Sequence, residues 1–357
     1  MPDQNSCAAS WAQPFASTLG VEEALAELTR QTTRTLGVGA AARARMLNLV
    51  AISSDPRSAA TADRLLGTLG RVHPSRLARV RLDPAAADEV RAQIAVRCRL
   101  EEGSECPVVY ETVEVEAGGN AARHLVELIA PVLEADLPVI IWWAGLPPFG
   151  ESTFIELLAF ADQFVVDSAA LGEEGVGPLA DLLATGPPIT DLAWGRLRPW
   201  RDLVAALFDL PPLATAIGEI RALTVSDAGA PVEALLLVGW LAAALGWHAA
   251  LPSSGGDRSR RSLVRPGGEV ALTFVSENGP PGLRQLAVEA GDAHLVITAG
   301  DTNADARIAR AGAPSIARHE RLVIPDDGAL LASALLRRGR DPDWEAALRV
   351  AALLARR

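Results

Sequence analysis

Two segments of the chain set large aromatic rings beside turn residues. The first reads Asp136-Leu-Pro-Val-Ile-Ile-Trp-Trp-Ala-Gly-Leu-Pro-Pro-Phe149, and the second, which adds arginines, reads Asp191-Leu-Ala-Trp-Gly-Arg-Leu-Arg-Pro-Trp-Arg-Asp202. Trp and Arg are enriched at the energetic centres of protein interfaces, and a guanidinium can stack on an indole ring. The second segment is therefore expected either to bind a partner protein or to bridge two domains inside the chain, through Trp194, Arg196, Arg198, Trp200 and Arg201. If it binds a partner, Arg198→Ala with Trp200→Ala should weaken that binding and leave the thermal melt nearly unchanged.

Two other groups of residues could bind a phosphate group. His73 and Arg76 stand between an expected helix end and an expected strand start, where ligands of α/β sheets often bind. The alternative is that Pro74 ends the helix and His73 interacts with the helix dipole. A short basic run beside two glycines could also hold a phosphate, or could be a solvated loop; it contains Arg258, Arg260, Arg261 and Arg265.

Cysteine and metal chemistry have a weaker basis. Cys98 and Cys106 flank the expected turn of a hairpin and could form a disulfide or a redox switch, although two free thiols are the alternative in a reducing compartment. The five histidines are scattered, with no pair at metal-ligand spacing. Asp301-Thr-Asn-Ala-Asp305 lacks the glycine and glutamate that a calcium loop requires, so we expect a turn there and no metal site.

Several catalytic classes are excluded by residue type. The chain has no lysine, which removes Schiff-base chemistry and the phosphate-loop lysine. Gly-x-Ser-x-Gly is absent, and Gly37-Val-Gly39 lacks the third glycine and the strand-turn-helix context of a dinucleotide site. We therefore expect no catalytic residues and no cofactor.

Composition sets the class of protein. At 357 residues, of which 49% are hydrophobic, the chain can bury the cores of two domains. Its net charge of −11 argues against nucleic-acid binding, which basic surfaces drive. The most apolar stretch, Ala234 to Trp247, is 14 residues long, whereas a membrane span needs about 20. Because no signal peptide is evident either, we expect a cytoplasmic protein without a membrane segment.

The elements that must position these residues alternate between helix and strand. The apolar run Pro138–Trp143 predicts a strand covered on both faces, as in the middle of a parallel sheet. Strands are also expected at 44–53, 76–82, 89–100, 108–116, 164–167, 219–226, 269–276, 283–290 and 293–298. Helices are expected at 21–36, 58–71, 121–134, 153–161, 180–183, 200–208, 231–245, 327–336 and 344–356.

This order predicts an α/β fold in two domains. We expect a flexible tail over residues 1–18 and an N-terminal α/β domain over 19–212, with a mixed or parallel sheet layered by helices. Leu210-Pro-Pro212 is the expected boundary, and a smaller C-terminal α+β domain is expected over 213–357.

Six stretches together resemble the glucose-6-phosphate dehydrogenase assembly protein family, OpcA. They are Met46–Val50, Val72–Arg76, Leu137–Trp143, Val165–Ser168, Asp191–Arg201 and Leu237–Trp247. The Trp/Arg stretch is the most specific of them. One departure is Cys106-Pro-Val-Val, where the family tends to read Cys-Ser-Glu-Gln, so a family role for Cys106 does not carry over.

The resemblance implies a non-catalytic partner of glucose-6-phosphate dehydrogenase, acting as an assembly factor or allosteric activator in the oxidative pentose phosphate pathway. Such an activator need only bind the active form of the enzyme better than the inactive form. The alternative from the residues themselves is an enzyme or sensor that binds a sugar phosphate through arginine-rich loops on an α/β sheet.

Overall fold

The computed structural model describes residues 6–14, 27–28, 30–31, 46–69, 76–99, 108–250 and 260–356. By its contacts the chain divides into two compact units. The first comprises Met1–Val166, Thr185–Thr190 and Asp327–Gly339, and the second comprises Asp167–Ala184, Asp191–Asp326 and Arg340–Arg357. Neither unit is continuous in sequence. These limits differ from the expected boundary at Pro212, which stays a prediction about independently folding parts.

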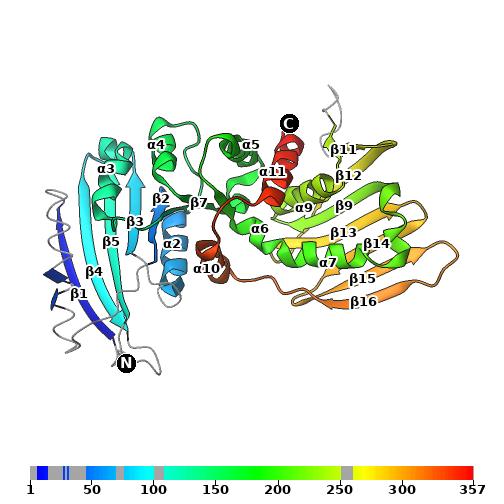
Figure 1. Cartoon of the computed structure of the whole chain (residues 1–357), viewed down its shortest axis with the longest axis horizontal. Coiled ribbons are helices and arrows are strands. Elements are labelled where there is room, and N and C mark those ends of the chain that lie inside the picture. The colour runs from blue at the N-terminus through cyan, green and yellow to red at the C-terminus, as the bar shows by residue number, and fades with distance from the viewer. Residues whose placement is uncertain are drawn as a thin grey trace. The chain divides into compact units, whose positions relative to one another are not determined.

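The first unit is built on an eight-stranded mixed sheet in the order β1-β4-β5-β3-β2-β6-β7-β8 (Figure 1). The successive pairs β5–β3, β3–β2, β2–β6 and β6–β7 are parallel, whereas β4 is antiparallel to both β5 and β1. The strands are β1 Ser6–Pro14, β2 Asn48–Ser53, β3 Arg76–Asp83, β4 Val90–Arg99, β5 Val108–Gly118, β6 Val139–Trp143, β7 Gln163–Val166 and β8 Ile189–Asp191.

The middle of this sheet confirms the expected strand at Pro138–Trp143. All five residues of β6 are buried, and Trp142 and Trp143, whose side chains point to opposite faces, are 2% and 1% exposed. Phe154 packs edge-on against Trp143 at 5.4 Å between ring centroids. The helices of this unit are α2 Pro56–Leu69, α3 Leu125–Ile129, α4 Ser152–Phe160 and α10 Asp327–Leu336, the last of which contacts α2.

One expected helix of this unit is wrong. Residues 121–134 form short pieces, the 3₁₀ turns η1 Gly119–Arg123 and η2 Ala130–Val132 on either side of α3, instead of one helix. Pro131 lacks the backbone N–H that a continuous helix needs at this position. The chain therefore enters β6 from a series of tight turns.

The second unit has its own eight-stranded sheet, in the order β10-β11-β12-β9-β13-β14-β15-β16. Strands β9 and β12 pair in parallel, and the other described neighbours are antiparallel. The strands are β9 Ile220–Ala228, β10 His248–Ala249, β11 Arg260–Arg265, β12 Gly268–Ser276, β13 Gly282–Ala290, β14 Ala293–Ala299, β15 Asn303–Arg310 and β16 Ile316–Arg321.

Helices of this unit cover one face of its sheet, where α9 contacts β9 and β13 (Figure 1). The helix α9 also packs along α11, and Gly239 marks their closest approach: a Cβ there would lie 2.3 Å from the carbonyl oxygen of Ala347. The helices and 3₁₀ turns are η3 Ser168–Leu171, α5 Gly172–Asp181, η4 Leu182–Ala184, α6 Leu192–Arg196, α7 Arg198–Phe208, α8 Pro211–Ala214, η5 Ile217–Glu219, α9 Pro231–Ala244 and α11 Pro342–Ala355.

Strands β1, β8, β10, β11, β15 and β16 were not expected from sequence, and β1, which pairs with β4, lies in the segment expected to be a tail. In β15 the buried positions carry Ala304, Ala306 and Ile308, and small alanines give only a weak alternating pattern. The expected turn at Asp301–Asp305 is thus partly wrong, because β15 already begins at Asn303. The α/β class is confirmed, with mixed sheets and helices in both units. Within the described residues no helix is both long and apolar enough to cross a membrane.

Candidate functional site

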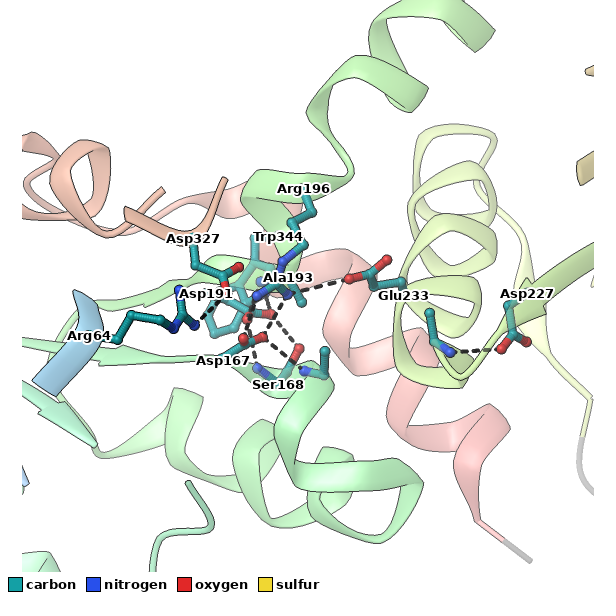
Figure 2. Close-up of polar contacts among 12 residues, drawn as sticks. Arg64, Asp167, Ser168, Asp191, Ala193, Arg196, Asp227, Glu233, Asp327 and Trp344 are labelled. Carbon is teal, nitrogen blue, oxygen red and sulfur yellow. Dashed lines mark hydrogen bonds and ion pairs between the residues drawn. The ribbon is translucent and has the colours of Figure 1, made fainter. Parts of the chain in front are cut away.

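The Trp/Arg segment lies in a buried polar network of the second unit (Figure 2). Asp191, at the end of β8, is 3% exposed and accepts four hydrogen bonds. Its Oδ1 accepts from the backbone N–H of Ser168 at 2.9 Å and of Ala193 at 3.0 Å. Its Oδ2 accepts from Ser168 Oγ at 2.6 Å and from Trp344 Nε1 at 3.1 Å. Asp191 therefore caps α6 and joins it to the turn after β7 and to α11.

An ion-pair cluster adjoins this carboxylate. The guanidinium of Arg196, at the end of α6, donates to both oxygens of Asp167 and lies 3.4 Å from Glu233 Oε1, which comes from α9. Burial raises the pKa of Glu233 to about 7, an effect that Arg196 partly offsets, and burial raises the pKa of Asp191 to about 6. The oxygens of Asp191 and Asp167 are already bonded within the fold. This arrangement is better suited to holding segments of the second unit together than to transferring a proton to a substrate.

The two tryptophans of the segment are buried as well. Trp194 and Trp200 are 3% and 2% exposed. Trp194 Nε1 donates to Asp341 Oδ2 at 3.0 Å, and the guanidinium of Arg201 lies 3.4 Å from the Trp194 ring centroid. Such stacking of Arg on Trp is a favourable cation–π contact. The expected contact residues Trp194, Arg196, Trp200 and Arg201 thus pack inside the second unit and offer little surface to a partner.

Arg198 differs, because its side chain is exposed on α7. Its Nε lies 3.7 Å from Asp202 Oδ2 one turn further on. It lines a groove of about 550 Å³ between α7 and the segment 318–325, to which Arg318 and Arg321 of β16 also belong. Sequence reasoning missed these two arginines because β16 itself was not expected.

Two of the described residues proposed for phosphate binding, Arg76 and Arg261, already have acidic partners, and a third, Arg265, donates to the carbonyl oxygens of Gly218 and Pro266. Arg76 Nη2 lies 3.0 Å from Glu111 Oε2 and 2.8 Å from Glu134 Oε2. Arg261 Nη2 lies 2.8 Å from Glu173 Oε2. An incoming phosphate would have to compete with these carboxylates. His73 and Arg258 lie outside the described residues, as does the side chain of Arg260.

The contact expected between Cys98 and Cys106 lies outside the described residues. The backbone of Cys98 lies in β4, opposite Cys7 of β1 and Val109 of β5, which agrees with the expected hairpin between β4 and β5. Its side chain and the whole of Cys106 lie outside the described residues. Among the residues that are described, no group of three or more His, Cys, Asp or Glu could hold a metal ion.

The ligand position typical of α/β sheets is taken by the chain itself. Strand β2 has β3, the next strand in sequence, on one side and β6 on the other. Ligands of α/β sheets usually bind outside the carboxyl ends of the strands at a point where the strand order reverses in this way. There Asp55 Oδ1 accepts from the backbone N–H of Arg57 and Ser58, at 2.9 and 3.0 Å, and Oδ2 accepts from Ser58 Oγ at 2.6 Å. These bonds, the one from the Ser58 hydroxyl above all, lower the pKa of Asp55. The first amides of α2 thus bind a carboxylate of the chain itself.

The chain is similar to proteins of known families over most of its length. Residues 67–183 match the N-terminal domain of the glucose-6-phosphate dehydrogenase subunit family, and residues 187–348 match the C-terminal domain of the same family.

Curated relatives are provisionally named as OxPP cycle protein OpcA. That of Synechocystis sp. is 30% identical over 186 residues, which are 50% of this chain and 39% of the relative. That of Synechococcus elongatus is 25% identical over 287 residues, 75% of this chain and 64% of the relative. The chain thus spans less than two thirds of the length of these relatives.

A solved structure of an oxidoreductase from Sinorhizobium meliloti is similar at a TM-score of 0.42 and 12% identity, covering 86% of this chain and 88% of that one. A likeness of this size carries no information about activity. The two domain matches, by contrast, cover the buried network, the second sheet and the first sheet except β1 and β2. Two of the stretches that carry the resemblance, Val165–Ser168 and Asp191–Arg201, meet in that network through Ser168 and Asp191. The chain belongs to the OpcA family of glucose-6-phosphate dehydrogenase subunit proteins.

Proposed function

We propose that this protein is a non-catalytic assembly factor or allosteric activator of glucose-6-phosphate dehydrogenase, acting in the cytoplasm in the oxidative pentose phosphate pathway. The observation that carries the proposal is the pair of domain matches, both of which are described as parts of a glucose-6-phosphate dehydrogenase subunit. The names of the curated OpcA relatives point to the same pathway.

Two features of the structure support a binding role over a catalytic one. The buried carboxylates around Asp191 are bonded within the fold, and the first turn of α2 holds Asp55. A protein that activates by binding needs no reactive group. It must contact the active oligomer of the enzyme more favourably than the inactive form, and a difference of about 1–3 kcal/mol changes an affinity roughly 5- to 150-fold.

The test is the glucose-6-phosphate saturation curve of the dehydrogenase from the same organism, with and without this protein, under reducing and oxidising conditions. We expect a lower Michaelis constant, a higher maximal rate or a larger oligomer by sedimentation when the protein is present. Identical curves and unchanged sedimentation under both conditions would reject the proposal.

The sugar-phosphate sensor is the competing function, and the same preparation tests it. Two of its described candidate residues, Arg76 and Arg261, are paired with Glu111 and Glu173, and Arg265 is bonded to backbone carbonyls, so we expect no binding of free glucose 6-phosphate to the isolated protein. Isothermal titration with glucose 6-phosphate measures this directly, and saturable binding without any effect on the dehydrogenase would favour the sensor.

A further inference from the structure

The groove between α7 and residues 318–325 has the length of an extended peptide. Along α7 its lining runs from Arg198 to Leu207, which at a rise of about 1.5 Å per residue is roughly 14 Å, and it continues to Leu210 just beyond the helix. An extended chain rises about 3.3 Å per residue, so roughly four or five residues fit along the α7 side of the groove. The strand on the other side, β16, is six residues long. A single phosphate would fill only a small part of this groove.

One side of the groove is a strand with a free edge. Strand β16 is the last strand in its sheet, and within the described part of the chain it pairs with β15 alone. Backbone N–H and C=O groups on an outer strand edge can pair with an added strand, which is a common way to bind an extended peptide. The outer edge of β16, a strand that contributes residues to the groove lining, is therefore open to an added strand.

The groove lining combines apolar contact with unpaired positive charge. Leu203 and Leu207 form part of its floor, and Val323, which is 40% exposed, lies on its rim. The side chains of Arg318 and Arg321 are exposed and form no hydrogen bond or ion pair with any described residue. Both therefore remain available to an acidic ligand.

The lining also contains two acidic side chains. Asp202 already lies beside Arg198, and Glu320 lies between the two free arginines in sequence. Three arginines against two carboxylates leave the groove lining with a charge of +1, while the chain as a whole carries −11. This local excess favours an acidic occupant and disfavours a basic one.

We propose that this groove binds an extended acidic segment of the dehydrogenase, which pairs as a strand with β16, places apolar side chains against α7 and sets carboxylates against Arg318 and Arg321. The inference rests on the proposed function for the identity of the partner. Its basis in this chain is the match in length, the free strand edge and the two unpaired guanidiniums.

The test compares the affinity of the full-length protein for the full-length dehydrogenase in three forms: the natural chain, the double charge reversal Arg318→Glu with Arg321→Glu, and the control Arg307→Glu. Arg307 is an exposed arginine of the neighbouring strand β15 that does not line the groove. We expect the double reversal to weaken binding at least tenfold and to abolish activation at limiting protein concentration, and the control to bind within about twofold of the natural chain.

Hydrogen exchange supplies a second readout. Those backbone amides of Ile316–Arg321 that point away from β15 should exchange more slowly in the complex, because an added strand protects the free edge. If the natural chain activates the dehydrogenase but the double reversal binds equally well, or binds more tightly, the groove proposal is wrong while the proposed function stands. If the natural chain neither binds nor activates the enzyme, both proposals fail.

Discussion

Asp191 and Glu233 show how single residues of the Trp/Arg region act. Both are carboxyl groups held in the second unit by donors that come from other segments of the chain: Ser168 and Trp344 bond Asp191, and Arg196 pairs with Glu233. Burying a carboxylate is costly unless it is hydrogen-bonded or paired. The arginine and the indole N–H are thus best explained as compensation for that cost.

Glu233 should make stability depend on pH. Burial raises the pKa of Glu233 from 4.5 to about 7, so the folded chain holds more protons than the unfolded chain between these values, and the free energy of unfolding falls as the pH rises through that window. In Glu233→Gln this contribution is absent. We expect the natural chain to gain up to about 3 kcal/mol relative to the variant on going from pH 8 to pH 5. Urea titrations of both proteins at the two pH values measure it, and a difference independent of pH would contradict the prediction.

Substitutions of Trp200 and Arg198 should distinguish a role in core packing from a role in binding a partner. Because Trp200 is 2% exposed, Trp200→Ala should lower the free energy of unfolding by about 3–5 kcal/mol, whereas Arg198→Ala on the exposed face of α7 should change it by less than about 0.5 kcal/mol. From sequence, both changes together were expected to leave the thermal melt nearly unchanged. Because Trp200 is buried, we now expect the double variant to melt at a lower temperature. Thermal denaturation of each single variant measures the two effects, and an unchanged melt for Trp200→Ala would place this side chain outside the core.

At the scale of elements, the packing of α9 on α11 depends on one missing side chain. Gly239 lies where a Cβ would be 2.3 Å from the backbone oxygen of Ala347, and a backbone atom cannot rotate away as a side chain can. Because α9 contacts both α11 and the sheet, its apolar residues are buried on nearly all sides of the helix. The glycine therefore sets the distance between the two helices.

Gly239→Ala should destabilise the protein by about 1–3 kcal/mol, because the helices must move apart or bend to admit the methyl group. The matched control is Gly67→Ala in α2, where nothing lies within 4 Å of the added Cβ. There the substitution should stabilise by about 0.5–1 kcal/mol, since alanine suits a helix interior better than glycine. Urea titration of both variants compares them; equal effects would mean that the helix contact is not close.

For the whole molecule, the chain path decides which fragments can fold. The second unit draws residues from three separate segments, and the network needs Asp167 and Ser168 from the first of them. A fragment that begins at residue 213 would keep Glu233 and Trp344 but lose Asp191 and Arg196. It would bury a carboxyl and an indole N–H without partners, which costs stability.

We therefore expect a fragment of residues 167–357 to unfold cooperatively, and a fragment of residues 213–357 to lack a cooperative transition. Near-ultraviolet circular dichroism and urea titration of the two fragments distinguish these outcomes. If the shorter fragment also folds cooperatively, the boundary after Pro212 marks an independent domain after all.

Local sequence was sufficient for the elements whose own pattern is strong. The apolar run of β6 and the apolar stretch of α9 predicted a strand and a helix close to the observed limits, and the strand expected at 283–290 is observed as β13. It was insufficient for β15 and β16, whose alanines and charges give little contrast between faces, and for residues 121–134, where Pro131 outweighs the helical pattern.

The sequence by itself determined the α/β class, the family resemblance and the unusual chemistry of the Trp/Arg segment. Only the tertiary structure decided which of those residues face inward. Trp194 is bonded to Asp341, 147 residues away, and Asp191 to Trp344, 153 residues away. Burial of a polar side chain depends on the partner that reaches it through space, and no local spacing encodes a partner so distant in sequence. For the same reason the groove was not predicted from sequence. Its arginines come from α7 and from a strand that follows α7 by more than a hundred residues.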